Sequence, residues 1–338
     1  MRRGLILTAK IGFTLALLWW AQTEFAADGL LSLYQDISPE FVAAAVAIQA
    51  ALTVLLTARW WLAARALGTR LPTMAAWRLV WIGQFFNQTL PSSLGGDAYR
   101  IWALCTRYGA SLGFASTSVV VDRLLALLAI PIIAMVGLWL VPEFTRRPDI
   151  AVILWPAVLA VAAVAIVLSR LDAVPAGWHR LAPRTFARAE WFSSALRGAA
   201  RRRPIAIAGV SLSIVIHMCV ALSVYMLTRA IGLDAKLLHI LLVTPLVLVI
   251  AMVPITISGW GLREGAMVTA FGALGYDVSL VFATSVAYGL TMIVIGLPGG
   301  LLWILQGSGE RSAREQPEQP DVKWSMAAAR SSTRRSRM

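Results

Sequence analysis

Long runs of apolar residues, each about as long as a membrane-spanning helix, dominate the chain. A helix that crosses a bilayer needs roughly 20 mostly apolar residues. Runs of this kind lie near residues 5–22, 40–58, 115–140, 150–169, 205–228 and 279–305. The pattern predicts an all-α fold, a polytopic membrane helix bundle with about six full spans.

Two further apolar stretches, near residues 74–94 and 237–275, are interrupted by polar patches that contain proline and glycine. The first patch covers residues 83–100 and the second covers residues 254–265. Each runs through hydroxyl residues and glycines to an acid and an arginine. Backbone groups must be paired inside a bilayer, so a helix broken at membrane depth is tolerated where it is buried or lines a cavity. One such break in each half of the chain is typical of a transporter with a central site.

Loop charges orient the spans, because cytoplasmic loops carry an excess of arginine and lysine. Residues 23–40 contain four acids and no base, whereas residues 58–78 contain four arginines and no acid. The loop 170–204 carries eight arginines against two acids. We therefore expect 23–40 outside and both termini in the cytoplasm. The first broken segment must then enter and return on one side, and the second must enter and return from the outside or else cross twice. We expect two re-entrant or half-crossing segments that approach from opposite faces, as in an inverted repeat.

The composition identifies an integral membrane protein, since 59% of the residues are hydrophobic and only 14% are charged. The net charge of +13 falls between the apolar runs, and no nucleic-acid-binding signature accompanies it. We therefore expect contact with anionic lipid headgroups and no nucleic-acid partner. The two cysteines, Cys105 and Cys219, stand in no metal-binding pattern. We expect no metal, no cofactor and no disulfide framework.

Both ends of the chain require interpretation. Arg2 and Arg3 precede the first apolar run, which is either a span or a cleaved signal peptide; Trp19 and Trp20 favour the span, as interfacial anchors. The polar end of the chain predicts a membrane domain over residues 1–306 and a disordered, basic cytoplasmic tail over residues 307–338. The tail either fixes topology or makes transient contact with anionic lipid.

Charged residues within or beside apolar sequence are the first candidates for a functional site: Asp97, Arg100, Asp122, Arg123, Arg263 and Glu264. A charge at membrane depth costs about 3 kcal/mol on insertion scales, so such residues are usually paired or functional. The planar donor forks of Arg100 and Arg263 suit phosphate oxygens. Alternatively, both arginines pair with the neighbouring acids and only hold the broken helices together. Asp122 and Arg123 form either a wall of a headgroup site or a helix-end pair.

Small and polar residues add donors around these arginines. Their backbone amides can cradle an anion, with help from nearby helix N-termini, at Ser92, Gly95, Gly96, Ser258 and Gly259. Asn87 either binds a headgroup hydroxyl or satisfies a freed backbone group. His217, inside a span, is either a proton relay or a hydrogen-bonded interior residue. The sequence shows no nucleophile with a base and no Walker loop, so we expect no enzymatic activity.

Taken together, the motifs resemble the transmembrane region of lysylphosphatidylglycerol synthases and related stand-alone flippase-like integral membrane proteins. The resemblance rests on Gln84-Phe85-Phe86-Asn87, Leu90-Pro91, Gly95-Gly96-Asp97, Arg100, Ser118, Asp122-Arg123, Pro254-Ile255, Gly259-Trp260-Gly261 and Arg263-Glu264, and extends over roughly residues 5–305. Asp122 and Trp260 depart from it, since glutamate and a second glycine are common there. The resemblance implies a module that moves lipid-linked headgroups between leaflets. In the bifunctional synthases a separate cytoplasmic domain transfers the aminoacyl group, so we expect no lysyl transfer here.

The preferred hypothesis is a flippase-like protein of the bacterial inner membrane that translocates a phosphate-bearing or anionic lipid, either a phospholipid or a lipid-linked sugar. Its expected partners are membrane lipids and a separate lipid-modifying enzyme. A membrane-embedded transferase, or an accessory subunit acting on lipid-linked sugars, is the first alternative. A regulatory or scaffolding protein whose polar patches only hold the fold together is the second.

Overall fold

The structure, a computed structural model, describes residues 36–68, 71–90, 94–141, 201–251 and 256–313, with a few isolated positions besides. The described part is entirely helical. Its helices are α2 (Pro39–Ala66), α3 (Thr73–Thr89), α4 (Gly95–Arg107), α5 (Leu112–Leu140), α10 (Arg203–Ile231), α11 (Leu237–Ala251), α12 (Leu262–Ala273) and α13 (Val278–Ala313). The prediction of an all-α membrane bundle is confirmed.

Within the described ranges, four helices are long and apolar enough to cross a membrane: α2, most of α5, α10 and the first 29 residues of α13. They coincide with the predicted spans near 40–58, 115–140, 205–228 and 279–305. The other two predicted spans, near 5–22 and 150–169, lie outside the described residues, as do the N-terminal arginines and residues 314–338. Helix α13 continues beyond the predicted domain boundary at residue 306, to Ala313.

The two polar patches interrupt pairs of short helices. Helix α3 ends at Thr89 and α4 begins at Gly95, while α11 ends at Ala251 and α12 begins at Leu262. These helices have 17, 13, 15 and 12 residues, so each is shorter than the roughly 20 residues that a spanning helix typically needs. Each pair forms a helical hairpin, which we call the first hairpin (α3–α4) and the second hairpin (α11–α12). The expected broken segments are present.

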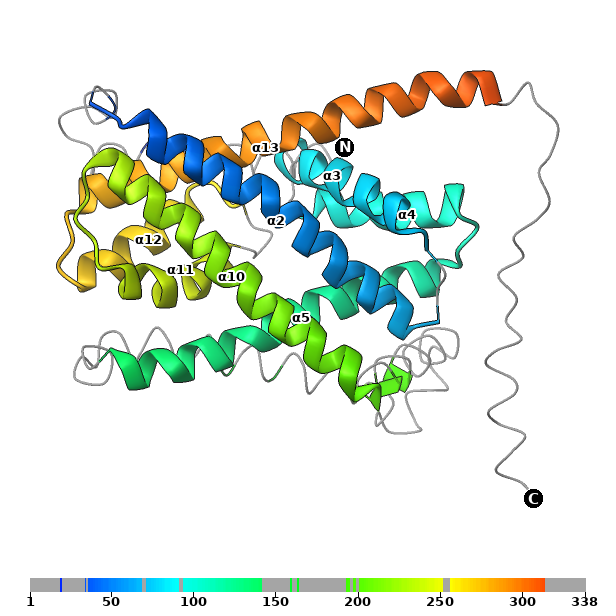
Figure 1. Ribbon diagram of the computed structural model, residues 1–338, viewed down its shortest axis with the longest axis horizontal. Coiled ribbons are helices and arrows are strands. Elements are labelled where there is room, and N and C mark those ends of the chain that lie inside the picture. Colours follow the sequence, from blue (N-terminus) through cyan, green and yellow to red (C-terminus); the bar gives the residue numbers. More distant parts are fainter. Residues whose placement is uncertain are drawn as a thin grey trace.

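The same order of elements occurs twice, because a long helix, a hairpin and another long helix make up each half of the described chain. Figure 1 shows that the halves run in opposite directions. Helix α2 runs from left to right and α10 runs back along it; their contact is the most extensive between any two described helices. The first hairpin enters from the right and the second from the left. This arrangement is that of an inverted repeat.

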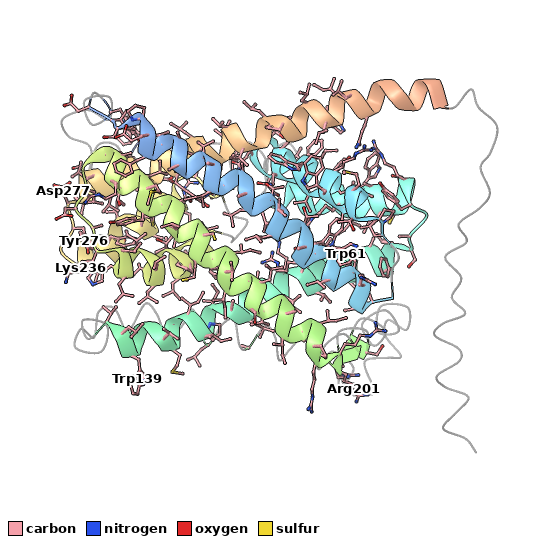
Figure 2. All side chains as sticks on the ribbon, viewed as in Figure 1. Trp61, Trp139, Arg201, Lys236, Tyr276 and Asp277 are labelled. Carbon is pink, nitrogen blue, oxygen red and sulfur yellow. The ribbon has the colours of Figure 1, made fainter. Side chains whose placement is uncertain are left out.

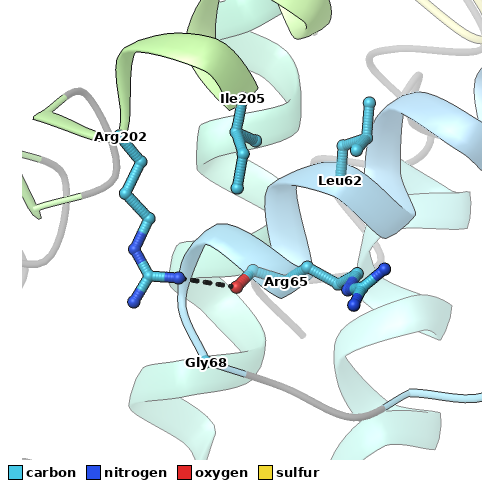
Figure 3. Close-up of a pocket in the computed structure, with 5 residues that line it drawn as sticks. All are labelled: Leu62, Arg65, Gly68, Arg202 and Ile205. Carbon is cyan, nitrogen blue, oxygen red and sulfur yellow. Dashed lines mark hydrogen bonds between the residues drawn. The ribbon is translucent and has the colours of Figure 1, made fainter.

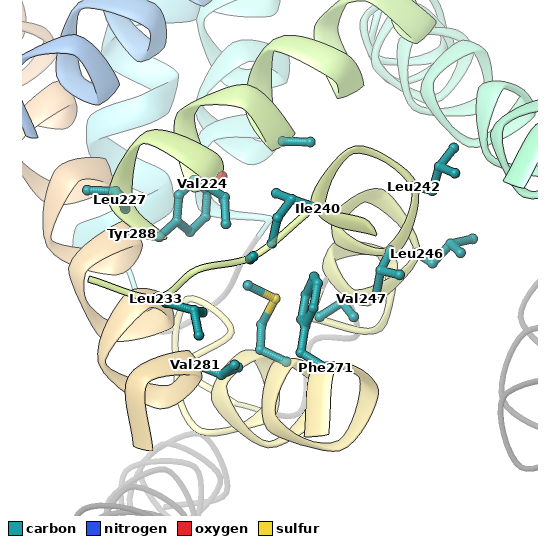
Figure 4. Packing of buried hydrophobic residues seen from close by; sticks show 14 of the residues in the cluster. Val224, Leu227, Leu233, Ile240, Leu242, Leu246, Val247, Phe271, Val281 and Tyr288 are labelled. Atoms are coloured by element: carbon teal, nitrogen blue, oxygen red, sulfur yellow. The ribbon is translucent and has the colours of Figure 1, made fainter. Parts of the chain in front are cut away.

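Each hairpin has its own apolar core. Around the second hairpin, Ile240, Phe271 and Val281 pack with Val224 and Leu227 of α10 (Figure 4). The core of the first hairpin is built on the buried side chains of Trp60, Leu79, Ile82, Tyr99 and Leu104. Because dense packing of this kind resists local rearrangement, we treat each hairpin with its flanking long helices as one unit.

Glycines allow the first hairpin to close. A Cβ atom on Gly96 would lie 2.1 Å from the carbonyl oxygen of Gly83, so α3 and α4 touch backbone to backbone. On the other side of α3, a Cβ on Gly299 of α13 would lie 2.0 Å from the carbonyl oxygen of Trp81. Small residues permit such approach between helices in membranes, where van der Waals contact drives association.

The surface between the two ends of the bundle exposes large apolar side chains, among them Ile132, Met135 and Trp139 on α5. Figure 2 shows Trp139 projecting from the side of the bundle, Arg201 and Trp61 towards its right-hand end, and Lys236 and Asp277 at its left-hand end. On a chain with spans of this length, an apolar flank is the surface that faces lipid.

Candidate functional site

Three helices bring five charged side chains together below the tip of the first hairpin. Asp97, in the first turn of α4, accepts a hydrogen bond from Arg100 on the same helix and one of 2.7 Å from Arg123 Nε on α5. Asp122 on α5 accepts bonds from Arg59 Nε of α2, at 2.7 Å, and from Arg100 Nη1, at 3.4 Å. The ion pairs thus form one chain, Arg123–Asp97–Arg100–Asp122–Arg59, which we call the first charged cluster.

The first charged cluster is buried, yet its charges do not cancel. Four of its side chains are between 4 and 10% exposed, whereas that of Arg123 is 28% exposed. Three guanidinium groups face two carboxylates, which leaves one positive charge. The guanidinium of Arg100 also lies over the Trp60 ring, 4.9 Å from its centre, where the π face compensates a little of this charge. A buried excess charge is costly, so the cluster favours an additional anion.

A second buried cluster surrounds Glu264 at the start of α12. Its Oε1 accepts bonds from Arg263 Nε at 2.9 Å and from Ser285 Oγ at 3.2 Å, and its Oε2 accepts the backbone N–H of Gly261 at 2.6 Å. Glu264, the third residue of α12, therefore caps the N-terminus of that helix, as in a capping box. With one arginine and one carboxylate, this second charged cluster is neutral.

Aromatic rings enclose the arginine of the second charged cluster. The guanidinium carbon of Arg263 lies 4.6 Å from the centre of the Trp260 ring and 5.6 Å from that of Tyr288. A Cβ on Gly289 would lie 2.3 Å from Arg263 Nη2, so the neighbouring glycine provides the space for this arrangement. Trp260, which departs from the resemblance, thus fills the room beside Arg263.

The tips of the two hairpins touch. Ser258 Oγ of the second hairpin donates a hydrogen bond of 2.8 Å to the carbonyl oxygen of Asn87 in the first, and Asn87 Oδ1 accepts the backbone N–H of Gly96 at 2.8 Å. Ser258 has a φ of 51°, and Gly259 and Gly261 follow at 80° and 82°. Serine is strained in this left-handed region. Segments about 170 residues apart therefore meet at the tips of the two hairpins.

Comparison with known proteins shows the family. Residues 7–300 match the family described as lysylphosphatidylglycerol synthase TM region. The chain belongs to this family. A UPF0104 membrane protein of Methanothermobacter thermautotrophicus is 24% identical over 269 residues, which cover 73% of this chain and 80% of that protein. A UPF0104 membrane protein of Methanocaldococcus jannaschii is 32% identical over 99 residues, 29% of this chain and 30% of that one. The resemblance inferred from the motifs is thereby confirmed.

In this family member, the predicted site residues separate into two groups. One group forms or adjoins the first charged cluster and the hairpin contact: Asn87, Gly95, Gly96, Asp97, Arg100, Asp122, Arg123 and Ser258. Gly259 is beside that contact, while Arg263 and Glu264 form the second cluster. Ser92 lies outside the described residues. Both Arg100 and Arg263 hold ion pairs here, so the structure shows the pairing that was one of the two expectations for them.

Sequence reasoning missed Arg59, which had been counted only as a loop charge. The structure places it inside α2, where it is 5% exposed, pairs with Asp122 and lies 3.4 Å from Ser213 Oγ of α10. The sequence feature that could have indicated a place inside a helix is its position directly before Trp60-Trp61, at the end of a long apolar run. Sequence alone does not show which distant acid such a residue meets.

Other polar groups are engaged within the bundle. His217 Nε2 lies 3.1 Å from the carbonyl oxygen of Ala126, one helical turn beyond Asp122. Its role as a proton relay stays a prediction. Gln84 Nε2 donates to Thr53 Oγ1 at 2.8 Å. In the part of the chain that the structure describes, no group of three or more His, Cys, Asp or Glu residues could hold a metal ion.

Tyr34, just before α2, connects the N-terminal side of that helix to α13. Its hydroxyl donates a hydrogen bond of 2.7 Å to the carbonyl oxygen of Ala283. Burial raises the pKa of Tyr34 to about 12, and the negative charge of Glu264 acts in the same direction. The hydroxyl therefore stays protonated, and keeps this bond, across the physiological pH range.

A separate pocket lies where the C-terminal turn of α2 meets the N-terminal turn of α10 (Figure 3). It is lined by Leu62, Arg65, Gly68, Arg202 and Ile205. Arg202 Nη1 donates a hydrogen bond of 3.3 Å to the carbonyl oxygen of Arg65. The pocket combines two guanidinium groups with an apolar floor, which suits the headgroup region of a bilayer. It contains none of the predicted site residues.

Proposed function

We propose that the protein translocates an anionic or phosphate-bearing lipid between the two leaflets of a membrane. The headgroup would pass between the hairpins while the acyl chains stay in lipid. The observation that carries this proposal is the first charged cluster: a buried set of charges with one positive charge in excess, beside the contact between two helical hairpins. Family membership and the inverted repeat support it, because such repeats commonly place their substrate site where broken helices meet.

The two clusters support different roles. The first has an excess guanidinium group, and one of its arginines is partly exposed, so it is able to accept an anion. The second is neutral, and its arginine is enclosed by Trp260 and Tyr288. We assign headgroup binding to the first charged cluster and a structural role, fixing the start of α12, to the second. The chain then binds and moves its substrate, and any change to the lipid belongs to a separate enzyme.

The ends of the bundle differ in charge, which supports an orientation. At the right-hand end of the bundle in Figure 1, α2 and α4 end and α10 begins; the sequence there includes Arg65, Arg107 and Arg201–Arg203. At the left-hand end α2 begins, α10 ends and α13 begins, and the sequence there includes Asp36, Glu40, Asp234 and Asp277 besides a few bases. By the excess of arginine, the right-hand end faces the cytoplasm. The first hairpin would then enter from the cytoplasm and the second from the outside, in the inner membrane of a bacterium with both termini in the cytoplasm.

A reconstituted transport assay tests the proposal. The full chain is placed in vesicles containing a fluorescent headgroup-labelled phosphatidylglycerol, and the lipid that reaches the outer leaflet is quenched with dithionite. Arg123→Lys removes the bidentate fork and should slow movement about tenfold. Arg263→Lys is the matched control, which should lower thermal stability but leave the rate per folded molecule within about threefold. Equal rates for the wild type and Arg123→Lys, or for the wild type and empty vesicles, would refute the proposal.

A further inference from the structure

The carboxylate of Asp97 joins two guanidinium groups that lie on different helices. Its Oδ1 accepts a bond from Arg100 of α4, and its Oδ2 accepts one of 2.7 Å from Arg123 of α5. An anion that offers two oxygens to two arginine forks is also what a lipid phosphodiester provides through its non-bridging oxygens. The carboxylate of Asp97 thus occupies a position that also suits the phosphate group of a lipid.

One end of the first charged cluster is accessible. The side chain of Arg123 is 28% exposed, whereas those of Asp97 and Arg100 are 8% and 10% exposed. An incoming anion therefore meets Arg123 first. When Asp97 is displaced from the arginines, Arg100 keeps Asp122 as a second partner at 3.4 Å. When the incoming anion replaces the Asp97 carboxylate, Arg100 and Arg123 therefore each still face a negatively charged group.

We propose that the Asp97 carboxylate stands in for the headgroup phosphate, which binds between Arg100 and Arg123 when a lipid enters. This inference rests on the proposed function for the identity of the ligand as a lipid. The charge of the Asp97 carboxylate narrows the ligand class. A phosphodiester carries one negative charge, as this carboxylate does, and replaces it without changing the net charge of the cluster, whereas a phosphomonoester carries about 1.5 to 2 negative charges at neutral pH. The site is therefore matched to a phosphodiester lipid.

Two variants with the same change in net charge test the position. The purified full chain in detergent is titrated with short-chain phosphatidylglycerol, and bound lipid is counted by native mass spectrometry. Asp97→Asn removes the competing carboxylate and should raise affinity about tenfold. Asp122→Asn adds the same positive charge at the inner end of the cluster and should raise affinity much less. Equal gains in both variants, or no gain in Asp97→Asn, would overturn the inference.

A measurement on the unaltered chain keeps the inference testable if either variant fails to fold. Phenylglyoxal modifies accessible arginines, and the modified positions are identified by mass spectrometry of peptides. Short-chain phosphatidylglycerol should protect Arg123, and short-chain phosphatidic acid at the same concentration should protect it less. Unchanged modification of Arg123 at saturating phosphatidylglycerol would overturn the assigned position.

Binding and transport are read separately, so the two proposals fail in different ways. If phosphatidylglycerol protects Arg123 but no lipid crosses the vesicle membrane, the proposed function is wrong and the phosphate site stands. If transport depends on Arg123 but Asp97→Asn gains no affinity, the proposed function stands and the role of Asp97 is wrong.

Discussion

At the scale of single residues, the same chemical pair serves two purposes in the two halves of the chain. Arg263 and Glu264 are neighbours that bond to each other and cap α12, so their charges cancel where they arise. Asp97 and Arg100 instead share their bonds with Arg123 and Asp122 on α5. Because the shared network has one cation too many, the first of the two buried clusters in the described ranges keeps an unmatched positive charge.

Gly96 offers the sharpest residue-scale prediction about stability. A methyl group there would be forced against the carbonyl of Gly83, and the α3 and α4 backbones would have to separate. We expect Gly96→Ala to cost about 1–3 kcal/mol and to lower the melting temperature, as overpacking does. Gly265→Ala in α12 is the control, since nothing lies within 4 Å of its added Cβ and alanine favours a helix. Thermal unfolding in detergent that ranks Gly265→Ala below Gly96→Ala would contradict this account.

At the scale of elements, each hairpin needs the other to complete its tip. The carbonyl oxygen of Asn87 near the end of α3 receives its side-chain donor from Ser258, in the break before α12. At membrane depth the freed backbone groups of a broken helix must find partners within the protein. On the proposed function, this hydrogen bond would have to break for a headgroup to pass between the hairpins.

Substitutions at Ser258 separate this hydrogen bond from the backbone strain beside it. Ser258→Ala removes the hydroxyl and keeps a side chain at φ 51°, whereas Ser258→Gly removes the hydroxyl and relieves the strain. Both should raise deuterium uptake at residues 83–90 of the first hairpin, although the change lies in the second. Gly265→Ala should leave that uptake unchanged. Uptake at 83–90 that matches the wild type in both Ser258 variants would show that the hydrogen bond does not hold the tips together.

The elements also show which parts of the fold and of the site are predictable from the sequence. The four described spans and both breaks were predictable, because uninterrupted apolar runs and proline–glycine patches are local signals. Helix α4 was less visible, since it mixes Asp97, Arg100 and Arg107 with apolar residues. The pairing of Arg59 with Asp122, 63 residues away, was not predictable, because periodicity tells which face a side chain lies on and not which helix it meets. The pairing of Arg263 with the adjacent Glu264 was one of the expectations, whereas the excess charge of the first cluster followed only from its contacts.

At the scale of the whole molecule, the two halves are inverted copies, so the membrane face from which one hairpin enters determines the face from which the other enters. If the arginine-rich end of the bundle faces the cytoplasm, the loop between α4 and α5 lies inside and the loop between α10 and α11 lies outside. The loop between α4 and α5 joins two helices of the first charged cluster, so its side fixes the face of the membrane from which the first hairpin enters.

Single cysteines test this orientation in cells. With Cys105 and Cys219 replaced by serine, Asp234→Cys introduces a thiol where the native side chain is 98% exposed, between α10 and α11. Arg201→Cys introduces one at the opposite end, at an exposed position before α10. A membrane-impermeant maleimide should label position 234 in intact spheroplasts and position 201 only after the membrane is opened. Labelling of both thiols from outside would refute opposite-facing hairpins. If position 201 is labelled from outside and position 234 only after the membrane is opened, the inverted repeat stands, but each hairpin enters from the other face. Only the expected pattern places the cytoplasm at the end of the bundle from which the first hairpin, with Asp97 and Arg100 of the first charged cluster, enters.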